Sequence, residues 1–434
     1  MVKMNASVAW QKLLDKYDIQ KQIKNEGTFK IKASQIKEFR EPRLMAKWDS
    51  SKLLPSSLKD KKINLLPDSR NSYVLSDFIL YENLPELTEQ IQDMSNVILP
   101  ELETIDIDNI TSEANAINML KISGILEEFL ELEHDDILYS TFDGRMSSGE
   151  FDFEVDSYSK IVRTVKVNKA QIEVDAGFES EKLIVILEAK NVLHEDFHIR
   201  QLYYPYRLWE AKVSKPIRLI FSIYTNKIFH LLEYSFDDTQ SYSSIKLKKL
   251  KSYSFENTDI TLDELISIYK ENDVCYFDDQ NSTNTPFIQA DNFDRIISLL
   301  ENMYDSEMTG EEIEELMQFT SRQRDYYFNA GKYLGLFEKS SQKGSGIKYK
   351  LTDLGVEIYK ENYKNRQLRL VKLILSHKIF NTLFKDIIES GELPSKEDVI
   401  KLELEYNVCS PQVADRRAGT VIGWLKWIFK LPSL

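Results

Sequence analysis

The chain has 434 residues and a formal net charge of −14, with 42% hydrophobic and 29% charged residues. These values are ordinary for a soluble globular protein and allow two to four domains. The two cysteines fit neither a disulfide framework nor a zinc cluster, which favours a reducing compartment. No stretch resembles a leader or approaches the roughly 18 apolar residues of a membrane span, so we expect a cytoplasmic protein without a membrane partner. The negative charge argues mildly against nucleic acid, but a local basic surface is enough for binding.

The first hundred residues mix short helical and extended segments and include "FREPRLMAKWD" at 39–49. We expect this region to help embrace DNA through the basic side chains of Arg40, Arg43, Lys47 and Arg70. Further along, "EANAINMLKISGILEEFLELE" (113–133) carries apolar residues at helical spacing and predicts one amphipathic helix.

The stretch "TFDGRMSSGEFDFEV" (141–155) predicts a glycine-flanked loop that leads into a strand. Arg145 and Ser147 in such a loop suit close approach to a phosphate backbone, and the loop suits an ordinary connection equally well. Alternating residues at 151–165 and 170–178 predict strands, and the apolar run at 183–190 predicts a buried strand.

The buried strand ends in a carboxylate and an amine. Side chains two apart share a face of a strand, so Glu188 and Lys190 emerge together. A turn near residues 176–181 would form a hairpin that brings Asp175 beside Glu188. Two converging carboxylates hold a hard cation such as Mg2+, and a neighbouring lysine can orient the attacking water and neutralise phosphate charge. The ordinary alternative is an exposed Glu-x-Lys pair at a strand end.

Asp175, followed thirteen residues later (188 − 175) by Glu188-Ala189-Lys190, resembles the PD-(D/E)xK nuclease signature. The run "IEVDAGFES…LIVILEAKN…HIRQLYYPYRLW" resembles the catalytic core of type II restriction endonucleases, although Val174 replaces the proline. The resemblance implies a mixed central sheet flanked by helices. It also implies Mg2+-dependent hydrolysis, with Mn2+ as an alternative ion, that leaves 5′-phosphate and 3′-hydroxyl ends. Asp175 and Glu188 would then be metal ligands, and Lys190 would orient the water.

A helix is expected at about 197–212. By the same resemblance Gln201 faces the site, although Pro205 breaks the Q-x-x-x-Y form found in some relatives. The same helix carries Tyr203, Tyr204, Tyr206 and Arg207. These side chains either face DNA or pack the helix on the sheet, with the tyrosine hydroxyls exposed to water. His194 and His198 have the spacing of a zinc pair but lack a third ligand nearby. An upstream glutamate (Glu127, Glu128 or Glu131) either reaches the metal, as in some relatives, or belongs to a solvated acidic face.

The polar stretch "DDQNSTNTP" (278–286) predicts a linker. Beyond it, two capped helices and a hairpin predict a winged helix-turn-helix, used for DNA or for protein contact. Its stretch "RQRDYYFNAGKYLGL" resembles modules attached to restriction enzymes. The candidate base contacts are Ser321, Arg322, Gln323, Arg324 and Lys332. Lys339 and Lys343 of the wing are expected to touch phosphates.

The C-terminal stretch "SKEDVIKLELEYNVCSPQVADRRAGTVIGWLKWIFKL" resembles another helix-turn-helix, with helices that start at Ser395 and Ser410. Arg416, Arg417 and Thr420 suit phosphate or base contacts, whereas Trp424 and Trp427 are expected in the core.

Together these features predict an α/β (α+β) protein: a central mixed β-sheet nuclease core flanked by helices, plus C-terminal helical winged helix-turn-helix domains. The expected division is a DNA-contacting region (1–100), a nuclease core (101–277), a winged helix (287–364) and a helix-turn-helix-like unit (365–434). We expect a sequence-specific double-stranded DNA endonuclease that acts as a homodimer, or as two copies that meet on DNA. The alternatives are a PD-(D/E)xK nuclease for repair or modified DNA, and a DNA-binding regulator with an inert nuclease fold.

Overall fold

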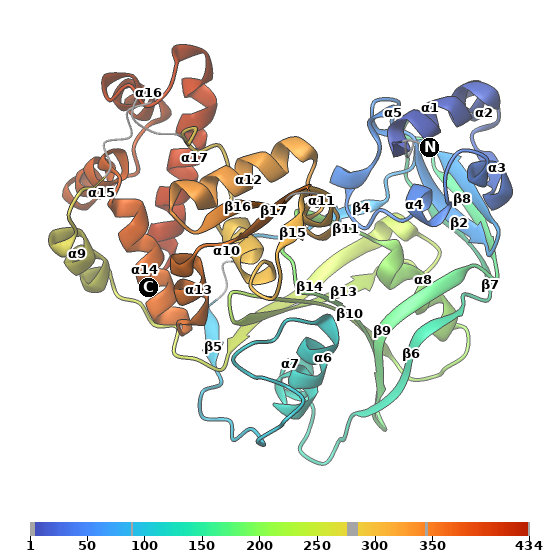
Figure 1. Cartoon of the computed structure of the whole chain (residues 1–434). Helices are drawn as coiled ribbons and strands as arrows, with labels where there is room; N and C mark the ends of the chain where they lie inside the picture. The colour runs from blue at the N-terminus through green and yellow to red at the C-terminus, as the bar shows by residue number, and fades with distance from the viewer. Residues whose placement is uncertain (1–4, 88–89, 276–284, 343–345, 433–434) are drawn as a thin grey trace.

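The structure is a computed structural model that describes residues 5–87, 90–275, 285–342 and 346–432 (Figure 1). Helices and strands both contribute, and the strands form mixed as well as antiparallel sheets, so the expected α/β class is confirmed. Among the described residues, no helix is long and apolar enough to cross a membrane.

The N-terminal unit (residues 5–76) packs short helices on a five-stranded sheet of order β1-β3-β2-β8-β7. Trp10, Leu13, Ile36 and Leu58 are completely buried in its apolar cluster. Two of its strands, β7 and β8, come from later in the chain, so the sheet is shared with the central region. The elements are α1 (Ala6–Lys16), α2 (Ile19–Glu26), β1 (Phe29–Lys32), α3 (Ala33–Lys37), α4 (Arg43–Ala46), η1 (Ser51–Leu53), α5 (Ser56–Lys59), β2 (Asn64–Ser69), β3 (Ser72–Ser76), β7 (Glu150–Val155) and β8 (Arg163–Asn168).

The central region is built on a seven-stranded sheet of order β5-β14-β13-β12-β10-β9-β6. β10 and β12 are parallel, with α8 as the crossover helix between them, and β9 and β13 run antiparallel to these two strands. Helices α6 and α7 cover one face, and α8 packs on the other (Figure 1). The elements are β5 (Ile91–Asp93), α6 (Glu113–Ile122), α7 (Ile125–Leu130), β6 (Tyr139–Ser147), β9 (Gln171–Glu179), β10 (Ile184–Lys190), α8 (Arg200–Glu210), β12 (Ile217–Thr225), β13 (Ile228–Phe236), η2 (Tyr242–Ser244) and β14 (Ile245–Ser254).

Four local predictions are corrected. The single helix expected at 113–133 is two helices, because Gly124 has a φ of 74° between α6 and α7, a conformation that glycine tolerates. The loop expected at 141–155 is mostly strand, β6 and β7, which turn at Gly149. The hairpin turn lies at 180–183 instead of 176–181. The helix expected from 197 begins at Arg200, because Asp196–His198 forms β11, which pairs with β4 (Tyr81–Asn83).

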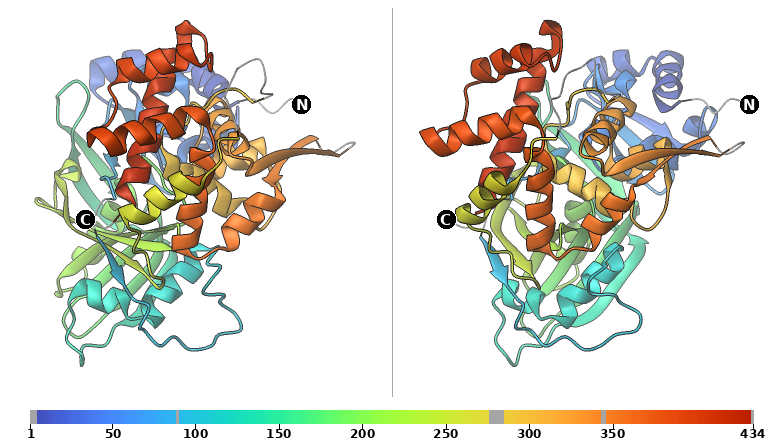
Figure 2. Two further views of the ribbon diagram at one scale, coloured as in Figure 1. Left: turned by 90° about the vertical axis from the view of Figure 1, so that its left-hand side faces the viewer. Right: turned by 60° about the vertical axis from the view of Figure 1, so that its left-hand side comes forward.

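The C-terminal unit (residues 285–432) begins with the element order of a winged helix: α10, β15, α11, α12 and the hairpin β16–β17, which projects from the body in Figure 2. Capping boxes at Thr309 and Thr320 start α11 and α12, as their sequence predicts. The described elements of this half, with the preceding α9, are α9 (Leu262–Glu271), α10 (Phe293–Asn302), β15 (Met308–Thr309), α11 (Gly310–Met317), α12 (Ser321–Tyr333), β16 (Phe337–Gln342), β17 (Gly346–Leu351), α13 (Asp353–Lys360), α14 (Tyr363–Leu375), α15 (Lys378–Ser390), α16 (Lys396–Glu405) and α17 (Pro411–Lys430).

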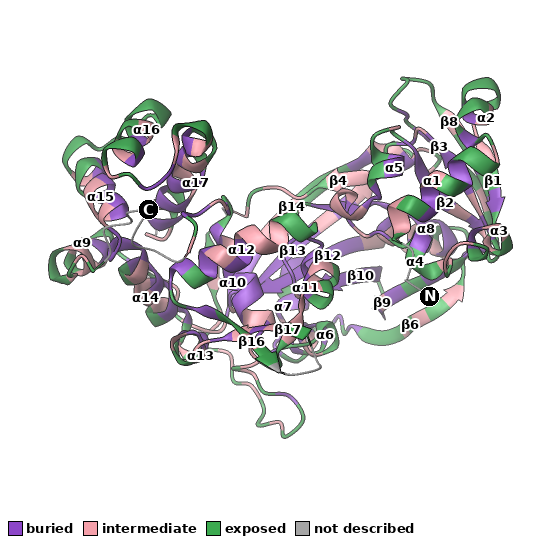
Figure 3. Cartoon of the chain, turned by 45° about the horizontal axis from the view of Figure 1, so that its top comes forward, coloured by how far each residue is buried: buried purple, intermediate pink, exposed green. Residues whose placement is uncertain are grey.

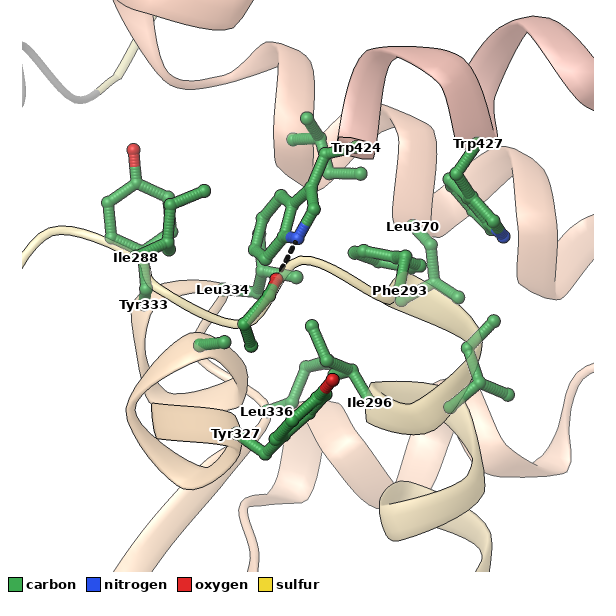
Figure 4. Close-up of a cluster of buried hydrophobic side chains, with 14 of the residues drawn as sticks. Ile288, Phe293, Ile296, Tyr327, Tyr333, Leu334, Leu336, Leu370, Trp424 and Trp427 are labelled. Atoms are coloured by element: carbon green, nitrogen blue, oxygen red, sulfur yellow. Dashed lines mark hydrogen bonds between the residues drawn. The ribbon is translucent and has the colours of Figure 1, made fainter. Parts of the chain in front are cut away.

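One apolar cluster runs through this unit from the winged helix to α17. Trp424 lies at its centre (Figure 4), completely buried, and its Nε1 donates to the carbonyl oxygen of Ala290 at 2.8 Å. Trp427 is also buried, which confirms the core role expected for both tryptophans. The predicted division at residue 364 therefore falls inside a shared core, and it stays a prediction.

Buried residues, purple in Figure 3, occupy strands β12 and β13 of the central sheet and helix α10 of the C-terminal unit, and polar contacts join these two parts. Arg366 and Glu301 form an ion pair of 2.8 Å, and the arginine side chain is only 1% exposed. Glu301 also accepts hydrogen bonds from the amide of Asn226 (2.9 Å) and the hydroxyl of Thr225 (3.0 Å) at the β12–β13 turn. Because these contacts are removed from water, they fix how the two parts are joined.

Candidate active site

The β9–β10 hairpin places Asp175 beside the end of β10. The antiparallel register runs as far as the pair of Ala176 and Leu187, and Asp175 and Glu188 are the next residues on the two strands. The Oδ2 of Asp175 accepts a hydrogen bond of 2.9 Å from the amide of Ala189. The hairpin pairing expected from the sequence is therefore present, and it is held by a side chain as well as by the ladder.

Glu188 and Lys190 emerge from the same face of β10. The Lys190 Nζ lies 2.5 Å from the Oε1 of Glu188, and the Nε2 of Gln201 on α8 donates to that same oxygen. Glu188 is 6% exposed, and the Lys190 side chain is 13% exposed. The structure thus brings Asp175, Glu188, Lys190 and Gln201 together at one end of a buried strand.

The environment of these groups changes their pKa values. Burial raises the pKa of Glu188 to about 8, against the opposing effect of the Lys190 charge. Burial acts to lower the pKa of Lys190, but the neighbouring carboxylates of Glu188, Glu113 and Asp175 outweigh it, and the pKa is raised. Lys190 is therefore a permanent cation, well suited to stabilising negative charge.

The upstream glutamate near the site is Glu113, at the first turn of α6, and none of the three that the sequence suggested. Glu113 is exposed, but desolvation by the surrounding protein still raises the pKa of its carboxyl, and the charges of Lys190 and Asp175 act on it. The expected glutamates are engaged elsewhere: Glu127 pairs with Lys121, Glu128 with Lys251, and Glu131 with Lys249. A glutamate at the first turn of a helix that packs on β10 is the available signal, whereas the glutamates expected from the sequence lie further along the same predicted helix.

A further carboxylate comes from the N-terminal unit. The charge of Asp49 contributes to the raised pKa values of Glu188, Lys190 and Glu113. The sequence of its segment indicates a role for the basic residues alone, and no local pattern predicts that the Asp49 charge acts on Glu188.

The donor chemistry of the site fits Mg2+ or Mn2+. Carboxylate and amide oxygens are the ligands that these hard ions prefer, and Asp49 Oδ1 and Gln201 Oε1 are buried without a hydrogen-bond partner in the described structure. As the side chains stand, no three His, Cys, Asp or Glu residues in the described ranges converge closely enough to hold an ion. Glu188 faces Lys190 and Gln201 instead, and Asp175 faces an amide.

The histidines do not form a shared site. His194 Nε2 lies 3.5 Å from the carbonyl oxygen of Leu316, and burial lowers its pKa to about 3. His198 Nδ1 is occupied by the Arg200 amide at 3.2 Å and the Tyr242 hydroxyl at 3.1 Å. His198 also belongs to β11 instead of a helix, so the i,i+4 geometry of a zinc pair is absent.

Arg207 lies inside the protein, which corrects its assignment to DNA. It is 6% exposed, and its Nη1 donates to the carbonyl oxygens of Asp152 (3.0 Å) and Thr239 (2.9 Å). Tyr203 and Tyr204 are completely buried, and their hydroxyls donate to backbone carbonyls instead of facing water. This face of α8 therefore holds the two sheets together.

Several candidates for backbone contacts lie on the surface. Arg43, Arg70 and Ser147 are exposed, and Arg145 is exposed with its Nε 3.5 Å from Glu173. Lys47 lies 4.0 Å from the same glutamate, and its charge also acts on Glu113. Basic side chains thus accompany the acidic site on the side of the β6–β9 ribbon.

Some of the residues expected to contact bases are exposed, and others are engaged in contacts within the protein. Ser321, Arg322 and Lys332 are exposed on α12, with the Arg322 guanidinium 5.3 Å from the centre of the Tyr326 ring. Gln323 is part of the helix cap, and Arg324 is bound by Glu314 (2.6 Å) and Asp325 (2.8 Å).

Of the basic residues expected to contact DNA from the wing and from α17, some are exposed and others are engaged within the protein. The exposed Lys339 Nζ lies 5.2 Å from the centres of the Phe328 and Tyr349 rings, and Lys343 lies outside the described residues. Arg416 is exposed, but Arg417 donates to the carbonyl oxygen of Phe287, and Thr420 is buried. Arg417 and Thr420 therefore belong to the packing of α17, which corrects their assignment to DNA.

A cavity of about 200 Å3 lies between the central sheet and the C-terminal unit. Asn191, Glu301 and Arg366 line it, whereas Asp175, Glu188 and Lys190 do not. The candidate site is thus separate from this cavity, on the face of β10 toward α8 and the N-terminal unit.

Matches to known family models divide the chain close to the boundaries between the N-terminal unit, the central region and the C-terminal unit. Residues 7–75, 76–254 and 295–433 each match a family model described only as a domain of unknown function (DUF6996, DUF6997 and DUF7226, respectively). No curated protein and no solved structure matches the chain. Asp175, Glu188, Lys190 and Gln201 all lie in the stretch similar to DUF6997, and Asp49 lies in the stretch similar to DUF6996.

Proposed function

We propose that the protein is a Mg2+-dependent endonuclease that cuts double-stranded DNA at specific sequences, in the manner of type II restriction enzymes. The observation that carries this proposal is the group at the end of β10. Asp175 accepts from the Ala189 amide at 2.9 Å, directly beside Glu188, whose carboxylate receives Lys190 at 2.5 Å. These are the residues that resemble the PD-(D/E)xK signature, and a rigid buried strand holds them.

Asp175 and Glu188 would hold the divalent ion, and the Glu113 carboxylate interacts electrostatically with Asp175 and Lys190. When bound, such an ion lowers the pKa of a water molecule and stabilises negative charge on a phosphoryl group. Lys190 keeps its proton among carboxylates, so it acts as a fixed cation that orients the water and neutralises phosphate charge. Gln201 holds the Glu188 carboxylate in place from α8.

Sequence reading is assigned to the exposed residues of α12. Arg322 suits bidentate contact with guanine; Ser321 precedes it, and Lys332 lies in the last turn of the same helix. Arg43, Arg70, Arg145, Ser147 and Arg416 are exposed on other elements and suit phosphate contacts that position the duplex. One catalytic centre faces a duplex of two strands, so two copies act on each site, as a homodimer or transiently on DNA.

The test is digestion of supercoiled plasmids and mixed-sequence DNA with Mg2+. The wild type is expected to give discrete fragments, and Glu188→Ala and Lys190→Ala are expected to cut at least about a hundredfold more slowly, a loss of ~3 kcal/mol of transition-state stabilisation. Glu181→Ala, on the exposed hairpin turn, is the matched control and should cut like the wild type. Wild-type protein that leaves all substrates intact, or variants that cut equally well, would contradict the proposal.

Two related functions are separated by the same assay. Faster cleavage of methylated than of unmethylated DNA would indicate a nuclease for modified or damaged DNA. Tight DNA binding without cleavage would indicate a regulator with an inert nuclease fold. Sequencing the fragment ends gives the target, the stagger and the chemistry of the termini.

A further inference from the structure

Residues 49–52 of the N-terminal unit are bound along the connection that leads from β10 to α8. The carbonyl oxygen of Asp49 accepts from the His198 amide at 2.9 Å. The amide of Ser51 donates to Asp196 Oδ1 at 2.9 Å, and its hydroxyl donates to the other oxygen of that carboxylate. Repeated bonds over a few residues fix the backbone, so Asp49 has a defined position.

One oxygen of the half-buried Asp49 carboxylate lacks a hydrogen-bond partner in the described structure. This oxygen, Oδ1, is inaccessible to solvent. A buried carboxylate oxygen without a partner is unfavourable, because it has lost its water and gained nothing in exchange. The neighbouring segment is tightly packed, with Trp48 and Ser50 both buried. The side chain is therefore held in an environment that a cation would improve.

The surroundings of Asp49 are the residues of the candidate site. Its backbone is bonded to His198, three residues before Gln201, and Gln201 in turn donates to Glu188. The charge of Asp49 acts on Glu188, Lys190 and Glu113. The charges of carboxylates from the N-terminal unit, from α6 and from the β9–β10 hairpin thus all act on Lys190, and Glu188 contacts it directly.

We propose that Asp49 is a metal-binding residue of the catalytic centre, supplied by the N-terminal unit. This inference rests on the proposed function and deepens it. A hard divalent cation accepts additional carboxylate oxygens, and the partnerless Oδ1 is a ligand of the right chemistry. The N-terminal unit is then a part of the active site as well as a region that contacts DNA. A chain that lacks this unit would have an incomplete centre.

The test is direct binding of Mn2+ to the full chain in the absence of DNA. Bound Mn2+ loses the sharp electron paramagnetic resonance signal of the free ion, so a titration gives affinity without reference to activity. We expect Asp49→Asn and Asp49→Ala to weaken binding at least about tenfold. Glu188→Gln should weaken it as well, whereas Asp60→Asn, an exposed aspartate of the same unit, should bind like the wild type. Unchanged circular dichroism and melting temperatures establish that the variants are folded.

The outcomes separate this inference from the proposed function. Wild-type affinity in both Asp49 variants, with weakened binding in Glu188→Gln, would overturn the role of Asp49 and leave the nuclease proposal intact. Faster DNA cleavage by Asp49→Asn would also overturn it, because that result describes an inhibitory contact. A wild type that neither binds Mn2+ nor cuts DNA would refute the proposed function, and this inference with it.

Discussion

Arg295 of α10 forms an ion pair with Glu195, which follows strand β10 by a few residues, and the two charged atoms are 2.9 Å apart. Arg295 is 2% exposed, and its other terminal nitrogen donates to the carbonyl oxygen of Met317 at 3.0 Å. Lys52 of the N-terminal unit lies 2.9 Å from the same glutamate, at the surface. Glu195 thus joins the N-terminal unit and the winged helix directly beside the candidate site.

The two partners of Glu195 are expected to differ in their contribution to stability. Glu195→Ala leaves the buried Arg295 without its carboxylate and should lower the free energy of unfolding by about 1–3 kcal/mol, less than for a fully buried pair because Glu195 is partly exposed. Lys52→Ala removes only a surface partner and should cost less than about 0.5 kcal/mol. Urea unfolding of both variants measures the difference, and equal effects would refute it.

Arg322 and Arg324 are neighbours on α12 with different expected roles. Arg322→Ala removes an exposed side chain and should weaken DNA binding by about 1–3 kcal/mol without a change in melting temperature. Arg324→Ala removes the partner of Glu314 and Asp325, so it should lower the melting temperature and affect DNA binding less. Fluorescence anisotropy with a DNA fragment that the wild type binds measures the change in affinity, and thermal unfolding measures the change in melting temperature. The reverse pattern would show that Arg324 leaves its ion pairs to contact DNA.

Two helical glycines give opposite predictions for the same substitution. A Cβ on Gly331 of α12 would lie 2.0 Å from the Phe337 ring, so Gly331→Ala should destabilise by about 1–3 kcal/mol through overpacking. A Cβ on the exposed Gly419 of α17 meets nothing within 4 Å, so Gly419→Ala should stabilise by about 0.5–1 kcal/mol through helix propensity. Thermal unfolding measures both, and a stabilised Gly331→Ala variant would contradict the close packing of α12 on the wing.

Glu403 of α16 should make stability depend on pH. It is completely buried, and burial raises the pKa of its carboxyl from 4.5 to about 7. The folded state therefore favours the protonated form, and this contribution is fully present below about pH 4.5 and is lost as the pH rises through 7. Glu403→Gln stays neutral, so its stability relative to the wild type should rise between pH 5 and pH 8 by on the order of 2 kcal/mol. Parallel stability profiles for the two proteins would contradict this expectation.

The local part of the candidate site was predictable from residue order. Alternation along 183–190 put Glu188 and Lys190 on one face, and the neighbouring strand of the hairpin brought the Asp175 carboxylate to the amide of Ala189, next to Glu188. The capping boxes at Thr309 and Thr320 were likewise visible, because a cap depends on residues three apart. These features depend on neighbours in the chain or on one short turn.

The sequence by itself determined the α/β class, the hairpin and the caps, because each arises from contacts over a few residues. Only the tertiary structure decided which distant side chains join them. It selected Glu113 over the glutamates of α7, and it brought the charge of Asp49 within electrostatic range of Glu188. It also buried Arg207 and bound the half-buried Arg417 to a backbone carbonyl oxygen. The physical reason is that an arginine or a carboxylate has the same local pattern on a surface as in an interior. Its role depends on which segments pack over it, and that is set by contacts between parts of the chain that lie far apart in sequence.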